Sequence, residues 1–101
     1  MADTFDYKKI DGIFESRIRL AVLSILATSE KVEFAYLKRK LKATDGNLGA
    51  HLKKLEDAKY IKCEKKFIKR KPVSFYYLTN TGRKAIESYL SLVENLLNNA
   101  E

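Results

Sequence analysis

One predicted helix, residues 44–58 (TDGNLGAHLKKLEDA), carries side chains that can bind a nucleic acid. At about 100° per residue, Leu48, Leu52 and Leu55 share a narrow arc, which predicts that they face a core. The opposite face is small, polar and basic, and consists of Gly46, Asn47, Ala50, Lys53 and Lys54. Asn47 offers a donor and an acceptor to base edges, and the lysines offer cations to phosphates or purine edges.

The start of this helix carries further candidates. Thr44 is the predicted N-cap, with its hydroxyl accepting from the amide of Gly46 or Asn47. Asp45 suits the positive end of the helix dipole, and we expect it to cap the helix or to accept from a cytosine amino group. His51, the single histidine, is expected to touch a phosphate, and a place at the boundary of core and solvent is the alternative.

Two glycines near the start of the helix argue for a close partner. Glycine costs roughly 1 kcal/mol relative to alanine in an exposed helix. We therefore expect that something approaches Gly46 and Gly49 closely, and the alternative is a face that only contacts solvent.

A basic β-hairpin is predicted directly after the helix, in KYIKCEKKFIKRKPVSFYYLT. Residues 59–71 contain seven Lys or Arg and one acid, Glu64. Residues 61–67 alternate between two faces and residues 73–78 are aromatic and β-branched, which indicates two strands. Because proline disfavours a paired strand position, residues 69–72 are the predicted turn. The hairpin residues predicted to bind DNA are Lys65, Lys66, Lys69, Arg70 and Lys71.

The hairpin has alternative interpretations. Arg70 is the candidate for insertion into a narrow minor groove, while lysines can also simply protect an edge strand from aggregation. Phe75, Tyr76 and Tyr77 could stack on single-stranded bases, but we favour their packing between hairpin and helices.

The remaining chain must position these two elements. Two short helices joined by a three-residue turn, residues 42–44, form a helix-turn-helix pattern. The predicted fold is mainly α with a β-hairpin, in the order α-α-α-β-β-α, within a single domain of residues 1–101. The expected elements are an N-terminal arm or short helix (1–14), a helix (15–27) with Ser16 as N-cap, a short strand at residue 32, helices (34–41 and 45–58), two strands, and a C-terminal helix (81–98).

The C-terminal helix is predicted to form a homodimer. Its apolar residues recur at intervals of four, three and four, as in a seam between paired helices. The predicted dimerisation residues are Ile86, Tyr89, Leu90, Val93, Leu96 and Leu97. A homodimer would present the helix at residues 44–58 of each copy to successive major grooves of a pseudo-palindrome. In the alternative, this helix folds back on helix 15–27 of its own chain.

Composition restricts the function classes. The formal net charge of +7 and pI of about 9.5 favour a polyanionic partner, since cations that contact phosphates release counterions. One histidine and one cysteine leave no catalytic set, metal site or disulfide framework, so we expect no enzyme activity and no cofactor. Cys63 is expected to be a buried strand residue rather than a redox sensor. With no apolar run of about 18 residues, we expect no membrane contact and a cytoplasmic location.

The chain resembles the small winged-helix transcriptional regulators of bacteria and archaea, in the broad MarR/ArsR-like group. The resemblance covers roughly residues 14–87 and is carried by SRIRLAVLSIL, TDGNLGAHLKKLEDAKYI and FIKRKPVSFYYLTNTGRKAI. It implies sequence-specific DNA binding by the third helix and the hairpin, called the wing, and dimerisation through terminal helices. Relatives usually have glycine where this chain has Lys59, so Lys59 must adopt a left-handed conformation or the helix must end differently.

The sequence therefore predicts a homodimeric repressor that binds double-stranded DNA, with the third helix in the major groove. A winged-helix protein-interaction module and an RNA or single-strand binder are the alternatives. No pocket for a small-molecule effector can be placed from the sequence.

Overall fold

The computed structural model describes residues 6–99. Two short 3-10 helices, Tyr7–Lys9 and Gly12–Phe14, precede four α-helices and a three-stranded antiparallel sheet. In chain order these are α1 (Arg17–Ala27), β1 (Val32–Glu33), α2 (Phe34–Leu41), α3 (Asp45–Asp57), β2 (Ile61–Ile68), β3 (Lys71–Leu78) and α4 (Asn80–Asn98). This order confirms the predicted fold, including the short strand before the second helix. Residues 1–5 of the expected N-terminal arm lie outside the described residues.

Hydroxyl side chains begin three of the helices. Ser16, Thr44 and Thr79 are the N-caps of α1, α3 and α4. Each hydroxyl accepts from the amide three residues later, at 3.2, 3.2 and 2.9 Å respectively. The predictions for Ser16 and Thr44 are thereby confirmed, and each cap satisfies an amide that the helix itself leaves unpaired.

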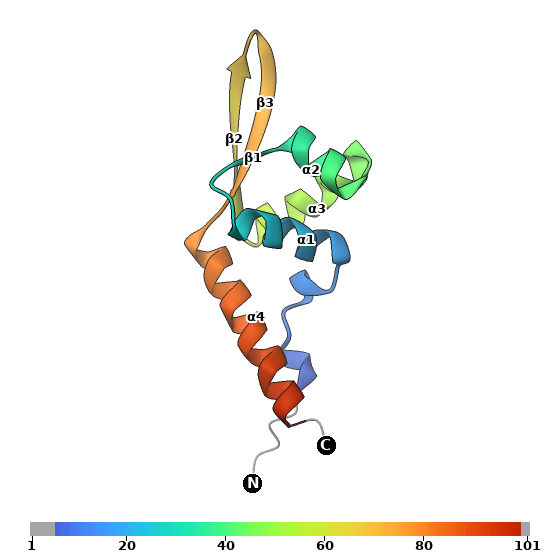
Figure 1. Ribbon diagram of the computed structural model, residues 1–101, viewed down its shortest axis with the longest axis vertical. Coiled ribbons are helices and arrows are strands. Elements are labelled where there is room, and N and C mark those ends of the chain that lie inside the picture. The colour runs from blue at the N-terminus through green and yellow to red at the C-terminus, as the bar shows by residue number, and fades with distance from the viewer. Residues whose placement is uncertain (1–5, 100–101) are drawn as a thin grey trace.

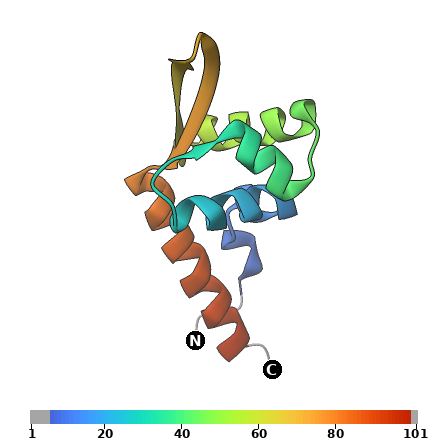
Figure 2. The ribbon, with the colours of Figure 1, turned by 45° about the horizontal axis from the view of Figure 1, so that its top comes forward.

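A leucine-rich core lies where α1, α2 and α3 meet the base of the sheet. Leu48, Leu52 and Leu55 are at most 1% exposed, as the helical spacing predicted. Leu23 and Leu37 contribute from α1 and α2. Figures 1 and 2 show that the wing and α4 extend from this body in opposite directions, with the N-terminal segment beside α4. The molecule is accordingly elongated, with principal extents of 62 × 25 × 21 Å.

The wing is a regular hairpin with a two-residue turn. β3 pairs with β2 along its whole length, from Ile61 opposite Leu78 to Ile68 opposite Lys71, and β1 pairs with β3 only near its base. The predicted turn at residues 69–72 is therefore wrong in its second half, since β3 already begins at Lys71.

Pro72 is tolerated in β3 for a geometric reason. It lies opposite Phe67, one pair beyond the pair that flanks the turn. In a two-residue hairpin that next pair is not hydrogen-bonded, so its amide positions point away from the partner strand. Because β1 pairs only with Phe75 and Tyr76 of β3, no strand lies on the outer side of Pro72, and the missing donor costs no ladder bond.

The junction of α3, the wing and α4 is formed by three residues, Tyr60, Thr79 and Gly82, which we call the Tyr60 joint. The Thr79 amide donates to the Tyr60 carbonyl at 3.0 Å, and the Thr79 hydroxyl donates to the carbonyl of Lys59 at 2.7 Å. A Cβ atom added to Gly82 would lie 2.2 Å from the Tyr60 carbonyl oxygen. Only glycine therefore allows α4 to approach the chain this closely.

The end of α3 follows the first of the two predicted alternatives. Lys59 has φ of 66°, in the left-handed region that glycine adopts most readily. The next amide, that of Tyr60, donates to the carbonyl of Leu55 at 3.0 Å and closes the helix. Lys59 thus accepts the backbone strain that a left-handed helix end requires.

We predict that Gly82→Ala lowers the free energy of unfolding by about 1–3 kcal/mol, because the new methyl group overlaps a backbone carbonyl. Urea denaturation followed by circular dichroism measures this change. Gly12→Ala is the matched control, since its Cβ atom would meet only the Glu15 carboxylate, at 3.9 Å. Equal losses in both variants would contradict the close approach.

Candidate nucleic-acid interface

The exposed face of α3 is held in place by its own buried face. Gly46, Asn47, Ala50, Lys53 and Lys54 are all exposed, opposite the buried leucines. An added Cβ atom on Gly46 or Gly49 would find no atom within 4 Å. Packing within the chain therefore gives no reason for glycine at these two positions. Their absence of side chains leaves the start of α3 open to close approach by another molecule.

Two exposed ion pairs flank this face. Lys38 of α2 lies 2.9 Å from the Asp45 carboxylate, and Lys53 lies 3.6 Å from that of Asp57. Asp45 is thus partly neutralised by a neighbouring helix, in agreement with a role at the helix end. Exposed pairs of this kind contribute only about 0–1 kcal/mol to stability. The Lys53 ammonium can therefore leave the Asp57 carboxylate and pair with a phosphate at little cost.

His51 is half-buried and bonded to Arg19 of α1. The guanidinium Nη1 lies 3.1 Å from His51 Nδ1, and the Arg19 Nε donates to the carbonyl of Ile13 at 2.8 Å. Burial, then the positive charges of Arg19 and Lys54, lowers the pKa of His51 below 6.5. The neutral ring accepts from Arg19 and keeps one N–H as a donor. The boundary position considered for His51 is the one observed, and its phosphate contact stays a prediction.

Arg19 was missed by sequence reasoning. It ties the N-terminal segment, through the carbonyls of Gly12 and Ile13, to the helix that carries His51. These partners are 6, 7 and 32 residues away along the chain. No periodicity or local motif in α1 indicates such a contact, because a single arginine beside an apolar stripe is equally suited to solvent.

The wing tip is strained and cationic. Lys69 and Arg70 form the turn with φ of 51° and 65°, both in the left-handed region. Two successive residues of this kind are typical of a type I′ hairpin turn, for which Asn-Gly is the favoured sequence. The five predicted wing residues are all exposed. Lys66 differs from the others, since its ammonium lies 3.5 Å from the Glu64 carboxylate and 5.9 Å from the centre of the Phe75 ring.

Of the three aromatic residues of β3, Tyr76 packs the wing onto the helices, as favoured from the sequence, whereas Phe75 and Tyr77 are half-buried and lie outside the core cluster. Tyr76 is 8% exposed, and its ring lies 6.5 Å from that of Phe34 in α2. Burial, then a hydrogen bond with half-buried Cys63, raises the pKa of Tyr76. A ring buried in this way cannot stack on a base, so Tyr76 is no platform for single strands.

The apolar stripe of α4 divides into two parts. Tyr89 stacks on Phe14 with ring centres 4.3 Å apart, and Ile86 packs against the core. These two predicted dimerisation residues thus contact their own chain, although Tyr89 stacks on Phe14, which lies just before the helix 15–27 that the alternative named. Leu90 and Leu97 are 59% and 75% exposed. Val93 and Leu96, the remaining two, are half-buried.

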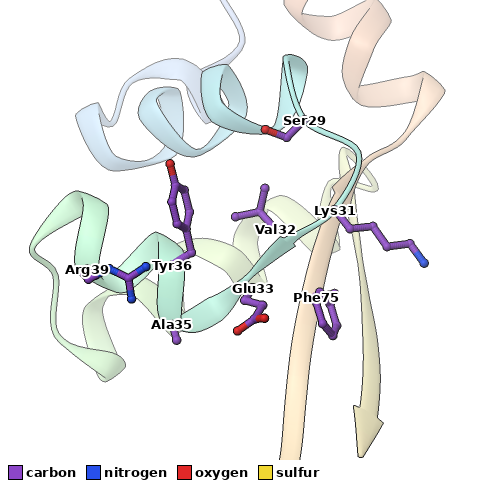
Figure 3. Close-up of a pocket in the computed structure, with 8 residues that line it drawn as sticks. All are labelled: Ser29, Lys31, Val32, Glu33, Ala35, Tyr36, Arg39 and Phe75. Atoms are coloured by element: carbon purple, nitrogen blue, oxygen red, sulfur yellow. The ribbon is translucent and has the colours of Figure 1, made fainter. Parts of the chain in front are cut away.

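An open hollow of about 430 Å³ lies between α2 and the base of the wing. Figure 3 shows that its lining comes from the loop between α1 and β1, from β1, from α2 and from β3. Its cations already have partners within the chain. Lys31 is paired with Glu64, and Arg39 lies 5.7 Å from the centre of the Tyr36 ring. This hollow therefore lacks the convergent polar groups that a specific ligand requires.

The described part of the chain has neither a cluster of metal ligands nor a helix that could span a membrane. In residues 6–99, no three His, Cys, Asp or Glu side chains are grouped to hold a metal ion. No helix there is both long and apolar enough to cross a membrane.

Comparison with known proteins identifies the fold. The model of the family described as winged helix DNA-binding domain matches residues 18–97. An uncharacterized protein of Methanocaldococcus jannaschii is 42% identical over 89 residues, which cover 88% of this chain and 97% of that protein. A transcriptional regulator homologue from Pyrococcus horikoshii OT3 has a TM-score of 0.82 at 25% identity, over 93% of this chain and 95% of that chain.

A second solved structure is more distant in sequence. An ArsR family transcriptional regulator has a TM-score of 0.62 at 22% identity, over 90% of this chain and 92% of that chain. At this identity the likeness supports the fold. The winged-helix resemblance stated from the sequence is confirmed by the family model, which matches residues 18–97.

We predict that the double variant Lys69→Asn/Arg70→Gly raises the free energy of unfolding by about 1–2 kcal/mol, because Asn-Gly adopts the left-handed turn with less strain. Thermal and urea denaturation measure the gain. The control Lys65→Gln/Lys71→Gln removes two charges at strand positions. An equal gain in that control would assign the effect to charge repulsion instead of backbone strain.

Proposed function

This chain belongs to the family of winged helix DNA-binding domains, and we propose that it is a sequence-specific transcriptional regulator acting on duplex DNA. The observation that carries the proposal is the position of the open face of α3 beside a basic wing. Both elements offer exposed cations, and α3 also offers small residues and an amide side chain for base edges.

The length of the wing supports simultaneous contact with two grooves. Cys63 and Tyr76 are the last opposed pair of the hairpin in contact with the core. From Cys63 to the turn, six residues at about 3.3 Å each give a reach of about 20 Å. One helical turn of DNA measures about 34–36 Å, so adjacent grooves lie roughly half of that apart. With α3 in the major groove, the wing tip would arrive at the neighbouring minor groove.

The proposed roles follow from these positions. Asn47 and Ala50 of α3 read base edges, while Thr44 and Asp45 organise the helix start. Lys53, Lys54 and the remaining N–H of His51 contact phosphates or purine edges. Arg70 enters the minor groove, and the other wing residues, Lys65, Lys66, Lys69 and Lys71, contact the backbone.

We also propose that the regulator is a homodimer and a repressor. Leu90 and Leu97 present exposed apolar surface on one side of α4, which a second copy would cover through a two-fold interface. Two copies would place two α3 helices on half-sites about one turn of DNA apart. Occupying a promoter in this way is sufficient for repression. Selection of bound sequences from random duplex DNA would report the operator and the half-site spacing.

We predict that Lys53→Ala, Lys54→Ala and Arg70→Ala each weaken duplex binding. For each lost phosphate contact, the slope of log affinity against log salt should become less negative by about 0.9. Fluorescence anisotropy with a labelled duplex at several salt concentrations measures both quantities. Lys84→Ala, at an exposed position of α4, is the matched charge control. Unchanged binding in all three test variants would refute the proposed interface.

We predict that Leu90→Glu and Leu97→Glu convert a dimer to a monomer, since each buries a carboxylate in the apolar contact. Sedimentation velocity at fixed concentration gives the oligomeric state. Ser91→Glu introduces the same charge at the neighbouring exposed position and should remain dimeric. A monomeric wild-type protein, or dimers in both leucine variants, would exclude this interface.

A further inference from the structure

Phe67 is the most exposed of the large apolar side chains that the structure describes, at 80%. It lies in β2, two residues before the turn, opposite Pro72. Strand alternation places Phe67 on the same face as Ile61 and Cys63, which contact the core near the base of the wing. The ring therefore faces the side of the wing on which the helices lie, but beyond the end of the core.

The surroundings of Phe67 are uniformly cationic. Lys65 shares its face, and the turn residues Lys69 and Arg70 follow directly, all of them exposed. Glu64, the only acid of residues 59–71, is paired with Lys31 near the base of the wing. An apolar ring inside a cationic tip matches a partner that is anionic outside and apolar within. Duplex DNA has this character, since phosphates border the grooves and the faces of the stacked bases between them are apolar.

The geometry points to Phe67 as an apolar wedge of the wing that enters the minor groove of duplex DNA at a base step. This inference rests on the proposed function, and it adds a contact that no charge of the wing supplies. Phe67 lies four residues beyond Cys63, about 13 Å along the strand, which covers most of the roughly 17–18 Å between adjacent grooves. Apolar side chains inserted at a base step are an established way of binding the minor groove.

Charge argues against the other occupants of this surface. A second wing tip would bring Lys69 and Arg70 of two copies together, and like charges at close range repel. The charge next to the apolar residues also differs between the two exposed apolar surfaces. Phe67 lies beside the cationic turn, whereas Leu90 and Leu97 of α4 lie beside the carboxylate of Glu94. The test below treats a self-contact of the wing as an outcome that overturns the inference.

The test compares Phe67→Ala with Ile68→Ala. Ile68 is adjacent, apolar and 43% exposed, but strand alternation directs it to the opposite face. The probes are two labelled alternating duplexes, inosine-cytosine and guanine-cytosine, which differ only by the amino group that guanine places in the minor groove. Anisotropy titrations give the affinity of each protein for each duplex and its dependence on salt.

The wedge predicts a specific pattern. The wild-type protein prefers the inosine duplex, whose minor groove is open. Phe67→Ala loses about tenfold in affinity for that duplex and loses the preference, because burial of an aromatic ring is removed. Its salt slope stays that of the wild type, since no phosphate contact is lost. Ile68→Ala and the conservative Phe67→Leu retain the preference.

The failures of the two proposals are distinguishable. A wild-type protein that binds neither duplex refutes the proposed function and the wedge together. Duplex binding that Phe67→Ala leaves unchanged, with or without an inosine preference, refutes only the wedge. A change of oligomeric state in Phe67→Ala alone, measured by sedimentation, assigns the ring to a contact between copies and also overturns it. Both alanine variants should keep the thermal midpoint of the wild type, because their side chains lie outside the core.

Discussion

The close approach of α4 to the carbonyl of Tyr60 is the constraint on which the arrangement of the molecule depends. The Tyr60 amide closes α3, and its carbonyl accepts from Thr79 and lies where a side chain at Gly82 would be. Its hydroxyl donates to the Asp11 carboxylate, and this bond, with burial, raises the pKa of Tyr60 to about 12. One residue thus connects α3, the wing, α4 and the N-terminal segment.

Several positions of the chain carry residues that stability alone would not favour. In the described chain, every residue with a positive φ is Lys or Arg, namely Lys42, Lys59, Lys69 and Arg70. Each left-handed residue other than glycine costs roughly 1–2 kcal/mol. Two of the four glycines, Gly46 and Gly49, instead occupy α3, where alanine would be more stable and would meet no obstacle. In the proposed interface, the cations at the corners and the open space on α3 would serve contact with a polyanion at the expense of folding stability.

The sequence predicted what local periodicity determines. Leu48, Leu52 and Leu55 define the buried face of α3 by spacing alone, and the threonine and serine caps mark helix starts by residue type. Pro72 was misjudged because the local preference of proline was applied without the register that makes its position harmless. The contacts of Arg19 with His51 and of Phe14 with Tyr89 join residues 32 and 75 positions apart, and no pattern along the chain encodes them.

The apolar stripe of α4 is only partly available for contact with a second copy. Because Ile86 and Tyr89 already pack on their own chain, α4 is oriented before any partner binds. In the proposed dimer, only the narrow remainder around Leu90 and Leu97 forms the contact between copies. The close contact of Gly82 with Tyr60 and the packing of Ile86 and Tyr89 hold α4 against its own chain, so contacts within each chain orient α4 relative to α3. The separation of the two reading helices, and with it the spacing of the half-sites, would then follow from the packing of α4 against α4.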